Sequence, residues 1–177
     1  ILQQGGNAVD AAVAIAAALA VTEPCSTGLG GDAFALVYSL KDNKVTAVNG
    51  SGRAPHTLSI DRLRFKGVTG SHIPPLSADS VTVPGAAGCW HDMVEIFGSL
   101  PFSQVLQPAI DLADGGFPVS PLTALAWSHE TRKLISQPNG RDLLVEGSRA
   151  PKEGELWRNI GLAKVLRTLG KEGKQRV

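Results

Sequence analysis

The chain changes character at Glu23-Pro24-Cys25-Ser26-Thr27-Gly28-Leu29-Gly30-Gly31-Asp32, a glycine-rich loop between two apolar segments. Before the loop, residues 11–21 are all apolar and mostly alanine, which favours a helix because alanine has the highest intrinsic helix propensity. After the loop, residues 33–38 predict a buried strand. Phosphate-binding loops lead from a strand into a helix N-terminus, whereas this loop leads from a helix into a strand. The order of elements therefore argues against a nucleotide site.

The predicted helix is a core element rather than a membrane span. It has almost no polar face, so protein or lipid must cover it. A bilayer span needs about 18 or more apolar residues, and residues 11–21 are too few. Glu23-Pro24 ends the helix, since the residue before a proline is disfavoured in the α conformation. Asn7 and Asp10 lie at its start, where capping and compensation of the helix dipole account for them.

The remaining sequence predicts an α+β fold with no internal repeat and no domain boundary within residues 1–177. A hairpin is expected from a strand over residues 34–38, a polar turn at 41–44 and a second strand over 45–49. Gly50-Ser51-Gly52-Arg53-Ala54-Pro55 follows as a flexible element that holds one arginine. The other expected elements are a strand over 80–84 and helices over 59–65, 85–97, 102–114, 121–135 and 160–169.

The charge balance points away from an electrostatic partner. The formal net charge is +1, with 17 basic and 16 acidic residues. Nucleic-acid-binding proteins usually show a clustered basic face, and only residues 171–176 are even mildly basic. We therefore expect no nucleic-acid partner.

The cysteines and histidines show no pattern typical of a metal or cofactor site. Cys25 and Cys89 fit neither a disulfide framework nor a zinc site, and two buried thiols are favoured over a bridge. No motif places a histidine beside Cys25, which argues against a cysteine nucleophile. The histidines are scattered without ligand spacing, at His56, His72, His91 and His129. The sequence therefore predicts no metal site.

Motifs along the chain resemble the opening of the large subunit of γ-glutamyltranspeptidases (glutathione hydrolases). They cover nearly all of the sequence in order, at residues 5–12, 23–24, 28–32, 49–55, 80–85, 97–102, 108–110, 116–120, 157–159 and 162–166. The version Gly50-Ser51-Gly52-Arg53-Ala54-Pro55 is similar to the branch of the family that contains cephalosporin-acylase-like members.

The resemblance implies part of the αββα sandwich of N-terminal-nucleophile hydrolases, incomplete without the rest of the proenzyme and its small subunit. The helix over residues 8–21 is then expected to pack against the hairpin. In that family the proenzyme cuts itself before a threonine, whose hydroxyl attacks the γ-glutamyl amide while the freed α-amino group serves as base. Water or an amine then accepts the acyl group, and no cofactor is needed. No segment of this sequence matches that threonine, so the chain alone is expected to be inactive and to supply no catalytic residue.

Arg53 is the substrate-binding residue that the resemblance implies, as the partner of the α-carboxylate in a γ-glutamyl compound such as glutathione. A planar guanidinium matches a carboxylate with two donors, and the flanking glycines let a ligand approach the backbone. Without the resemblance, a solvated arginine in a turn is the simpler interpretation. Asp32 is expected to bond loop amides, and the loop glycines are expected to supply unusual backbone conformations, at Gly28, Gly30 and Gly31.

Two further interpretations stay open. An acylase that cleaves glutaryl-type amides is one, because its substrate also presents a carboxylate to Arg53. The other is a non-catalytic, truncated paralogue that acts by binding.

Overall fold

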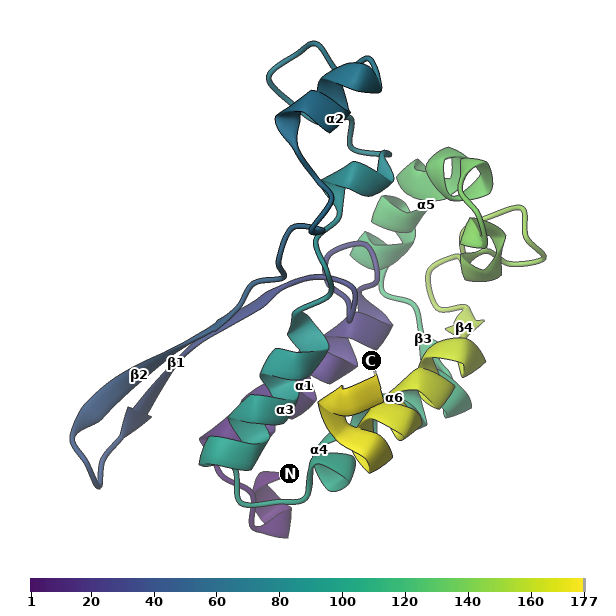
Figure 1. The fold of residues 1–177 in the computed structure, drawn as a ribbon. Helices are drawn as coiled ribbons and strands as arrows, with labels where there is room; N and C mark the ends of the chain where they lie inside the picture. Colours follow the sequence, from purple (N-terminus) through teal and green to yellow (C-terminus); the bar gives the residue numbers. More distant parts are fainter. Residues whose placement is uncertain (177) are drawn as a thin grey trace. The chain divides into compact units, whose positions relative to one another are not determined.

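The computed structural model describes residues 1–176, which form two compact units (Figure 1). One unit comprises residues 1–28 together with the segment from His91 onward, and the other is Leu29–Trp90. Mixed helix and strand content agrees with the expected α+β class. The expectation of a single domain without a boundary stays a prediction.

The first unit is built around α4 (Phe102–Gly115), which contacts both α1 (Ala8–Thr22) and α6 (Ile160–Glu172). The fully buried side chains of α4 recur three or four residues apart, as in an amphipathic helix, and they are Val105, Leu106, Ala109 and Ala113. Helix α5 (Pro121–Ser136) completes the set of long helices that begin and end in this unit. These helices confirm the expected ranges, with ends that differ by up to three residues.

Short elements connect the helices of this unit. Strand β3 (Phe117–Pro118) pairs antiparallel with β4 (Leu156–Trp157), a pairing that the sequence analysis did not predict. The indole of Trp127 donates from Nε1 to the carbonyl of Leu143 at 3.0 Å and packs edge-to-face on Trp157. The remaining elements are the 3-10 helices η1 (Leu2–Gln4), η3 (Gly140–Leu143) and η4 (Gly173–Arg176).

Helix α1 is buried on one side only. Its buried apolar residues are Val13, Ala14, Ala17, Ala20 and Val21. Ile15 and Leu19 are 59% and 38% exposed, so the expectation of a fully covered helix is wrong for that face. None of the described helices combines the length and the hydropathy needed to cross a bilayer.

A capping box starts α1 and ties it to the segment after Phe97. The side chain of Asn7 accepts from the backbone N–H groups of Val9 and Asp10, and Asp10 Oδ2 accepts from the N–H of Asn7 at 2.8 Å. The same Asp10 oxygen accepts from the N–H of Ser99 at 2.9 Å, and Asn7 donates to the carbonyl of Phe97 at 2.7 Å. The capping role expected for Asn7 and Asp10 is confirmed, and it extends to a contact across the unit.

Substitution of Asp10 tests whether its hydrogen bonds to Asn7 and Ser99 stabilise the unit. Asp10 is 0% exposed, and Asp10→Ala leaves the N–H groups of Asn7 and Ser99 without their charged acceptor. We expect the free energy of unfolding to fall by about 2–4 kcal/mol, measured by chemical denaturation. Among the described residues, the exposed carboxylate of Asp111 accepts a hydrogen bond only from Gln107 of its own helix, so Asp111→Ala should change stability by less than about 0.5 kcal/mol. Equal effects of the two substitutions would contradict a stabilising role for the hydrogen bonds of Asp10.

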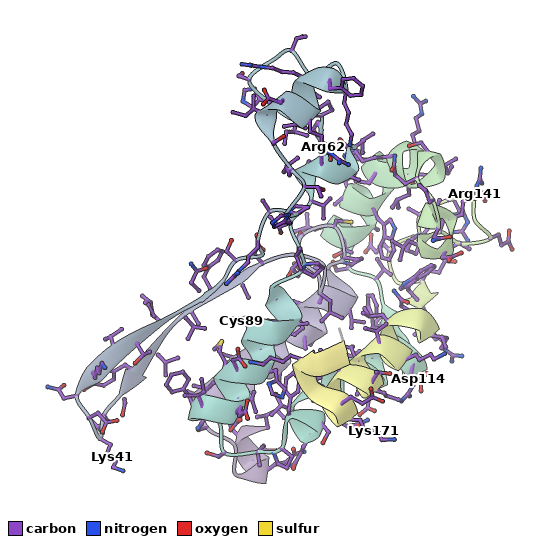
Figure 2. The ribbon with its side chains drawn as sticks, viewed as in Figure 1. Lys41, Arg62, Cys89, Asp114, Arg141 and Lys171 are labelled. Atoms are coloured by element: carbon purple, nitrogen blue, oxygen red, sulfur yellow. The ribbon has the colours of Figure 1, made fainter. Side chains whose placement is uncertain are left out.

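The second unit contains a two-stranded hairpin. Strands β1 (Ala33–Ser39) and β2 (Lys44–Gly50) pair antiparallel, in a register that runs from Ala33↔Gly50 to Ser39↔Lys44. Lys41 lies at the tip of the hairpin (Figure 2). The hairpin confirms the expectation, but β1 is not a buried strand. Phe34, Leu36 and Tyr38 are 68%, 77% and 56% exposed because nothing described covers that face.

The rest of this unit is short elements and loop. It contains α2 (Ile60–Phe65), η2 (Ala78–Ser80) and the first residues of α3 (Ala86–Phe97). The strand expected over residues 80–84 is absent. Val83 donates its N–H to the carbonyl of Arg53 at 2.9 Å, but Pro84 has no N–H to extend a ladder.

Glycines allow three loop segments of this unit to cross at close range. The carbonyl of Gly31 accepts from the N–H groups of Gly85 and Ala86 at 3.1 and 2.9 Å. A Cβ on Gly52 would lie 1.8 Å from the carbonyl oxygen of Val83. A Cβ on Gly50 would lie 2.3 Å from Cβ of Cys89, and one on Gly85 would lie 2.3 Å from the carbonyl oxygen of Gly50.

Two of the three loop glycines that the sequence analysis singled out are not constrained. Gly28 and Gly30 have no positive φ, and a Cβ on either would meet open space. The expectation of unusual backbone conformations is therefore wrong for these two residues. The close backbone approach occurs instead at Gly50, Gly52 and Gly85.

A matched pair of alanine substitutions separates these two kinds of glycine. Gly52→Ala must push two backbone segments apart, so we expect a loss of at least about 1–3 kcal/mol in the free energy of unfolding. Gly30→Ala adds a methyl group into open space and should leave stability unchanged or slightly raised. Thermal melting of both variants against the unsubstituted chain measures the difference. A Gly52→Ala variant that melts like the Gly30→Ala variant would contradict the crossing.

Candidate functional site

The candidate site centres on Arg53, which lies in the irregular segment between β2 and α2. Two hydrogen bonds fix its backbone. The N–H of the preceding Gly52 donates to Asp32 Oδ1 at 2.6 Å, and the Arg53 carbonyl accepts from the N–H of Val83 at 2.9 Å. The Cα of Arg53 is thus held from both sides by neighbouring segments of the same unit.

The side chain of Arg53 is exposed, and its guanidinium makes no hydrogen bond or ion pair within the described residues. Some other arginines of the chain do have partners. Arg149 holds Glu155 with two bonds of 2.8 and 2.9 Å, and Arg167 pairs with Asp114. A fixed backbone with an open guanidinium is an arrangement that can bind a carboxylate bidentately.

Asp32 holds the loop rather than a ligand. Its Oδ1 accepts from the N–H of Gly52 and, at 3.3 Å, from the hydroxyl of Thr82. The expected role of Asp32 as an acceptor of loop amides is confirmed. Because this carboxylate oxygen is occupied by the backbone of the arginine segment, it positions Arg53 without neutralising the guanidinium.

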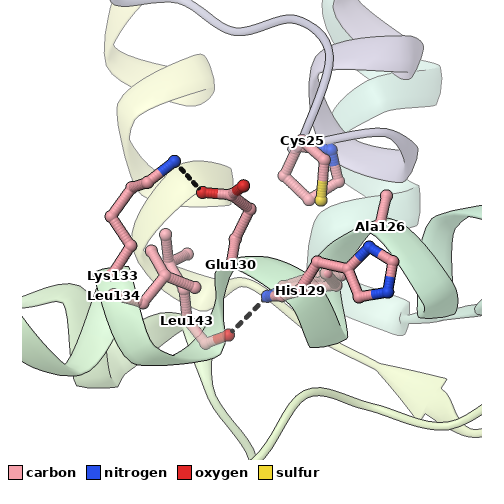
Figure 3. Close-up of a pocket in the computed structure, with 9 residues that line it drawn as sticks. Cys25, Ala126, His129, Glu130, Lys133, Leu134 and Leu143 are labelled. Carbon is pink, nitrogen blue, oxygen red and sulfur yellow. Dashed lines mark hydrogen bonds and ion pairs between the residues drawn. The ribbon is translucent and has the colours of Figure 1, made fainter. Parts of the chain in front are cut away.

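A separate cavity of about 500 Å³ lies within the first unit (Figure 3). Its lining includes Cys25, His129 and an ion pair between Glu130 and Lys133. Partial burial, and then the nearby charge of Glu130, raises the pKa of the Cys25 thiol, so the nucleophilic thiolate is disfavoured. The cavity brings His129 into the same lining as Cys25, which no sequence motif indicated.

The state of the cysteines differs in part from the expectation. Cys89 is buried, as expected. Cys25 is a free and exposed thiol, so the expectation of burial is wrong for Cys25, and the bridge between the two cysteines does not form.

The sequence is similar to known proteins along its whole length. The family described as gamma-glutamyltranspeptidase matches residues 1–177. The glutathione hydrolase-like YwrD proenzyme of Bacillus subtilis is 38% identical over 175 residues, covering 98% of this chain and 33% of that protein. Glutathione hydrolase 3 of Arabidopsis thaliana is 35% identical, covering 98% of this chain and 26% of that protein. The chain therefore spans a third or less of these two relatives.

Solved structures agree with the sequence relatives. A cephalosporin acylase from Bacillus halodurans superposes with a TM-score of 0.90 at 40% identity, covering 98% of this chain and 33% of that one. The γ-glutamyltranspeptidase of Helicobacter pylori superposes with a TM-score of 0.88 at 30% identity, covering 97% of this chain and 50% of that one.

These matches confirm the resemblance carried by the sequence motifs. The family is one of N-terminal-nucleophile hydrolases and includes both γ-glutamyltranspeptidases and acylases, and several of its members are proenzymes. With a family match over residues 1–177 and relatives of more than 30% identity that cover nearly the whole chain, this protein belongs to the gamma-glutamyltranspeptidase family.

Proposed function

We propose that this chain is the N-terminal part of the large subunit of a γ-glutamyltransferase/glutathione hydrolase, in which Arg53 binds the α-carboxylate of the γ-glutamyl substrate. The observation that carries this proposal is the open guanidinium of Arg53 on a backbone held by Asp32 and Val83. The arginine segment is already ordered in the folded chain, so less conformational entropy is lost when a carboxylate binds. More of the free energy of the contact then contributes to affinity.

The catalytic step belongs to the remainder of the proposed proenzyme. After self-cleavage, the threonine at the start of the small subunit attacks the γ-glutamyl amide, and water or an amine takes the acyl group from the enzyme. This chain contributes recognition of the substrate carboxylate, and by itself it is inactive.

The exposed face of the hairpin is the proposed contact with the rest of the αββα sandwich. Phe34, Leu36 and Tyr38 lie on one face of β1, and their register partners on β2 include Val45 and Ala47. Val45 is 58% exposed as well. A contiguous apolar face of this kind on one side of a strand pair typically packs against a partner layer.

Dye binding tests whether this face awaits a partner. The isolated chain should bind a hydrophobic fluorescent dye more strongly than the mature two-subunit protein does. The double substitution Phe34→Ser with Leu36→Ser should reduce the signal of the isolated chain, whereas Lys44→Ser on the same hairpin should not. An isolated chain with a signal as low as that of the mature protein would overturn the assignment of this face.

An acylase is the second candidate. The structure of the cephalosporin acylase from Bacillus halodurans has 40% identity with this chain, against 30% for the Helicobacter pylori γ-glutamyltranspeptidase. A glutaryl-type side chain presents a terminal carboxylate that Arg53 would bind in the same way. Turnover of glutathione and of a glutaryl amide by the mature protein, measured in parallel, separates the two candidates.

Substitution of Arg53 tests the site in the proposed proenzyme. Arg53→Lys keeps the charge but loses the planar pair of donors. We expect kcat/KM for γ-glutamyl substrates to fall tenfold to a hundredfold, equivalent to about 1.5–3 kcal/mol. Most of the loss should appear in KM, because the α-carboxylate is remote from the scissile amide. Self-cleavage should continue, since the bond cut there has no α-carboxylate.

The matched control is Arg64→Lys, because Arg64 is another exposed arginine of the same unit. It should leave KM unchanged. A γ-glutamyl analogue without the α-carboxylate should be a poor substrate and respond little to Arg53→Lys. An unchanged KM in the Arg53→Lys protein would reduce Arg53 to a solvated turn residue. Absence of both self-cleavage and turnover in the unsubstituted protein would favour the non-catalytic alternative.

A further inference from the structure

We propose that His91, Asp92 and Glu95, on the last turns of α3, form a binding site for a divalent transition-metal ion such as Zn²⁺. The three residues lie in the first unit, and each offers one ligand atom. This site is independent of the proposed function, because it shares no residue with Arg53 or its supports.

The separations between the ligand atoms suit one ion. Nδ1 of His91 lies 3.6 Å from Asp92 Oδ1 and 3.5 Å from Glu95 Oε2, and all three atoms lie within 4.8 Å of one another. Zinc binds imidazole nitrogen and carboxylate oxygen at about 2.0–2.2 Å in a tetrahedron, which puts neighbouring ligand atoms about 3.3–3.6 Å apart. Glu95 is exposed, so its side chain is free to complete the arrangement by rotation.

Packing orients the imidazole of His91, and its Nδ1 lacks a hydrogen bond within the described residues. The ring packs edge-to-face on Phe102, with ring centroids 5.3 Å apart. Nδ1 is buried and accepts or donates no hydrogen bond within the described residues. Two carboxylate oxygens that face one imidazole nitrogen favour a positive charge between the three groups, which a metal ion would supply. Because the cluster combines one nitrogen with two oxygens, it favours zinc over Mg²⁺ and Ca²⁺, which prefer oxygen ligands alone.

Lys174 acts as the competing cation in the metal-free chain. Its ammonium pairs with Asp92 Oδ1. Metal binding must displace this ammonium from Asp92. Removal of the ammonium should therefore strengthen metal binding, whereas a structural role for Lys174 gives no such gain.

Helix α5 provides an internal control with the same spacing. His129 is followed by Glu130 and, four residues on, by Lys133. Lys133 pairs with Glu130, so a positive charge stands where α3 carries the carboxylate of Glu95. The spacing alone is thus present twice, but only α3 places two carboxylates around the imidazole among the described residues.

Zinc titration of the full chain, freed of metal by a chelator, tests the site by calorimetry. We expect one Zn²⁺ per chain and no comparable binding of Mg²⁺. His91→Ala and Glu95→Gln should each weaken zinc binding at least about tenfold, the loss that even an outer partner of a metal site causes. Lys174→Met should tighten binding, and His129→Ala should leave it unchanged. Circular dichroism checks that each variant is folded, and Glu95→Gln preserves the test if His91→Ala does not fold.

Four results would overturn the proposal. The first is absence of saturable zinc binding, and the second is binding that survives both His91→Ala and Glu95→Gln. The third is binding that is lost in His129→Ala, which would place the ion in the cavity beside Cys25. The fourth is a nitrogen NMR spectrum in which both nitrogens of His91 stay protonated when zinc is added, which would leave only an ion pair between His91 and the carboxylates. Because no readout uses activity, failure here leaves the proposed function standing.

Discussion

The backbone crossing at Gly52 is the constraint on which the Leu29–Trp90 unit depends. Three segments meet there, at residues 31–32, 50–53 and 82–86. They are joined by hydrogen bonds in which backbone N–H groups of one segment donate to a carbonyl or carboxylate oxygen of another. A loop without such bonds would leave polar groups unsatisfied wherever it is shielded from water. Glycine at positions 50, 52 and 85 lets these segments approach closely, so backbone hydrogen bonds and the Asp32 carboxylate supply the rigidity. Arg53 is thereby fixed through its main chain, and its guanidinium has no hydrogen bond or ion pair within the described residues.

Local signals determined the parts of the fold that were predicted correctly. Helix α1 begins at a capping box, which Asn7 and Asp10 indicate in the sequence, and Pro24 follows the end of the helix. The strand expected over residues 80–84 failed because Val81-Thr82-Val83 has strand propensity, whereas pairing depends on a distant segment and stops at Pro84. The prediction that β1 is buried was wrong for a related reason. The sequence of a strand indicates which side chains share a face, but not which part of the protein covers that face.

The candidate site shows the same division. Arg53 was identified through the family resemblance, because a glycine-flanked arginine on its own is typical of a solvated turn. A glycine is required where another segment of the fold approaches its backbone closely. The sequence alone does not show which segment approaches which glycine. Histidine spacing alone does not indicate the cluster around His91. On the predicted helix over residues 85–97, Glu95 at position +4 shares a helix face with His91 and was a signal within reach, whereas Asp92 at position +1 was not.

The placement of charge distinguishes three kinds of polar site in this chain. On α5 the positive Lys133 neutralises Glu130, so that helix presents a closed ion pair beside a neutral thiol. On α3 the corresponding position is Glu95, and the excess negative charge is offset only in part, by Lys174 at Asp92. Arg53 is the opposite case, because Asp32 accepts from the backbone and leaves the guanidinium uncompensated. Charge left uncompensated by the fold favours ligands of the opposite sign, so Arg53 suits a carboxylate and the α3 cluster suits a cation.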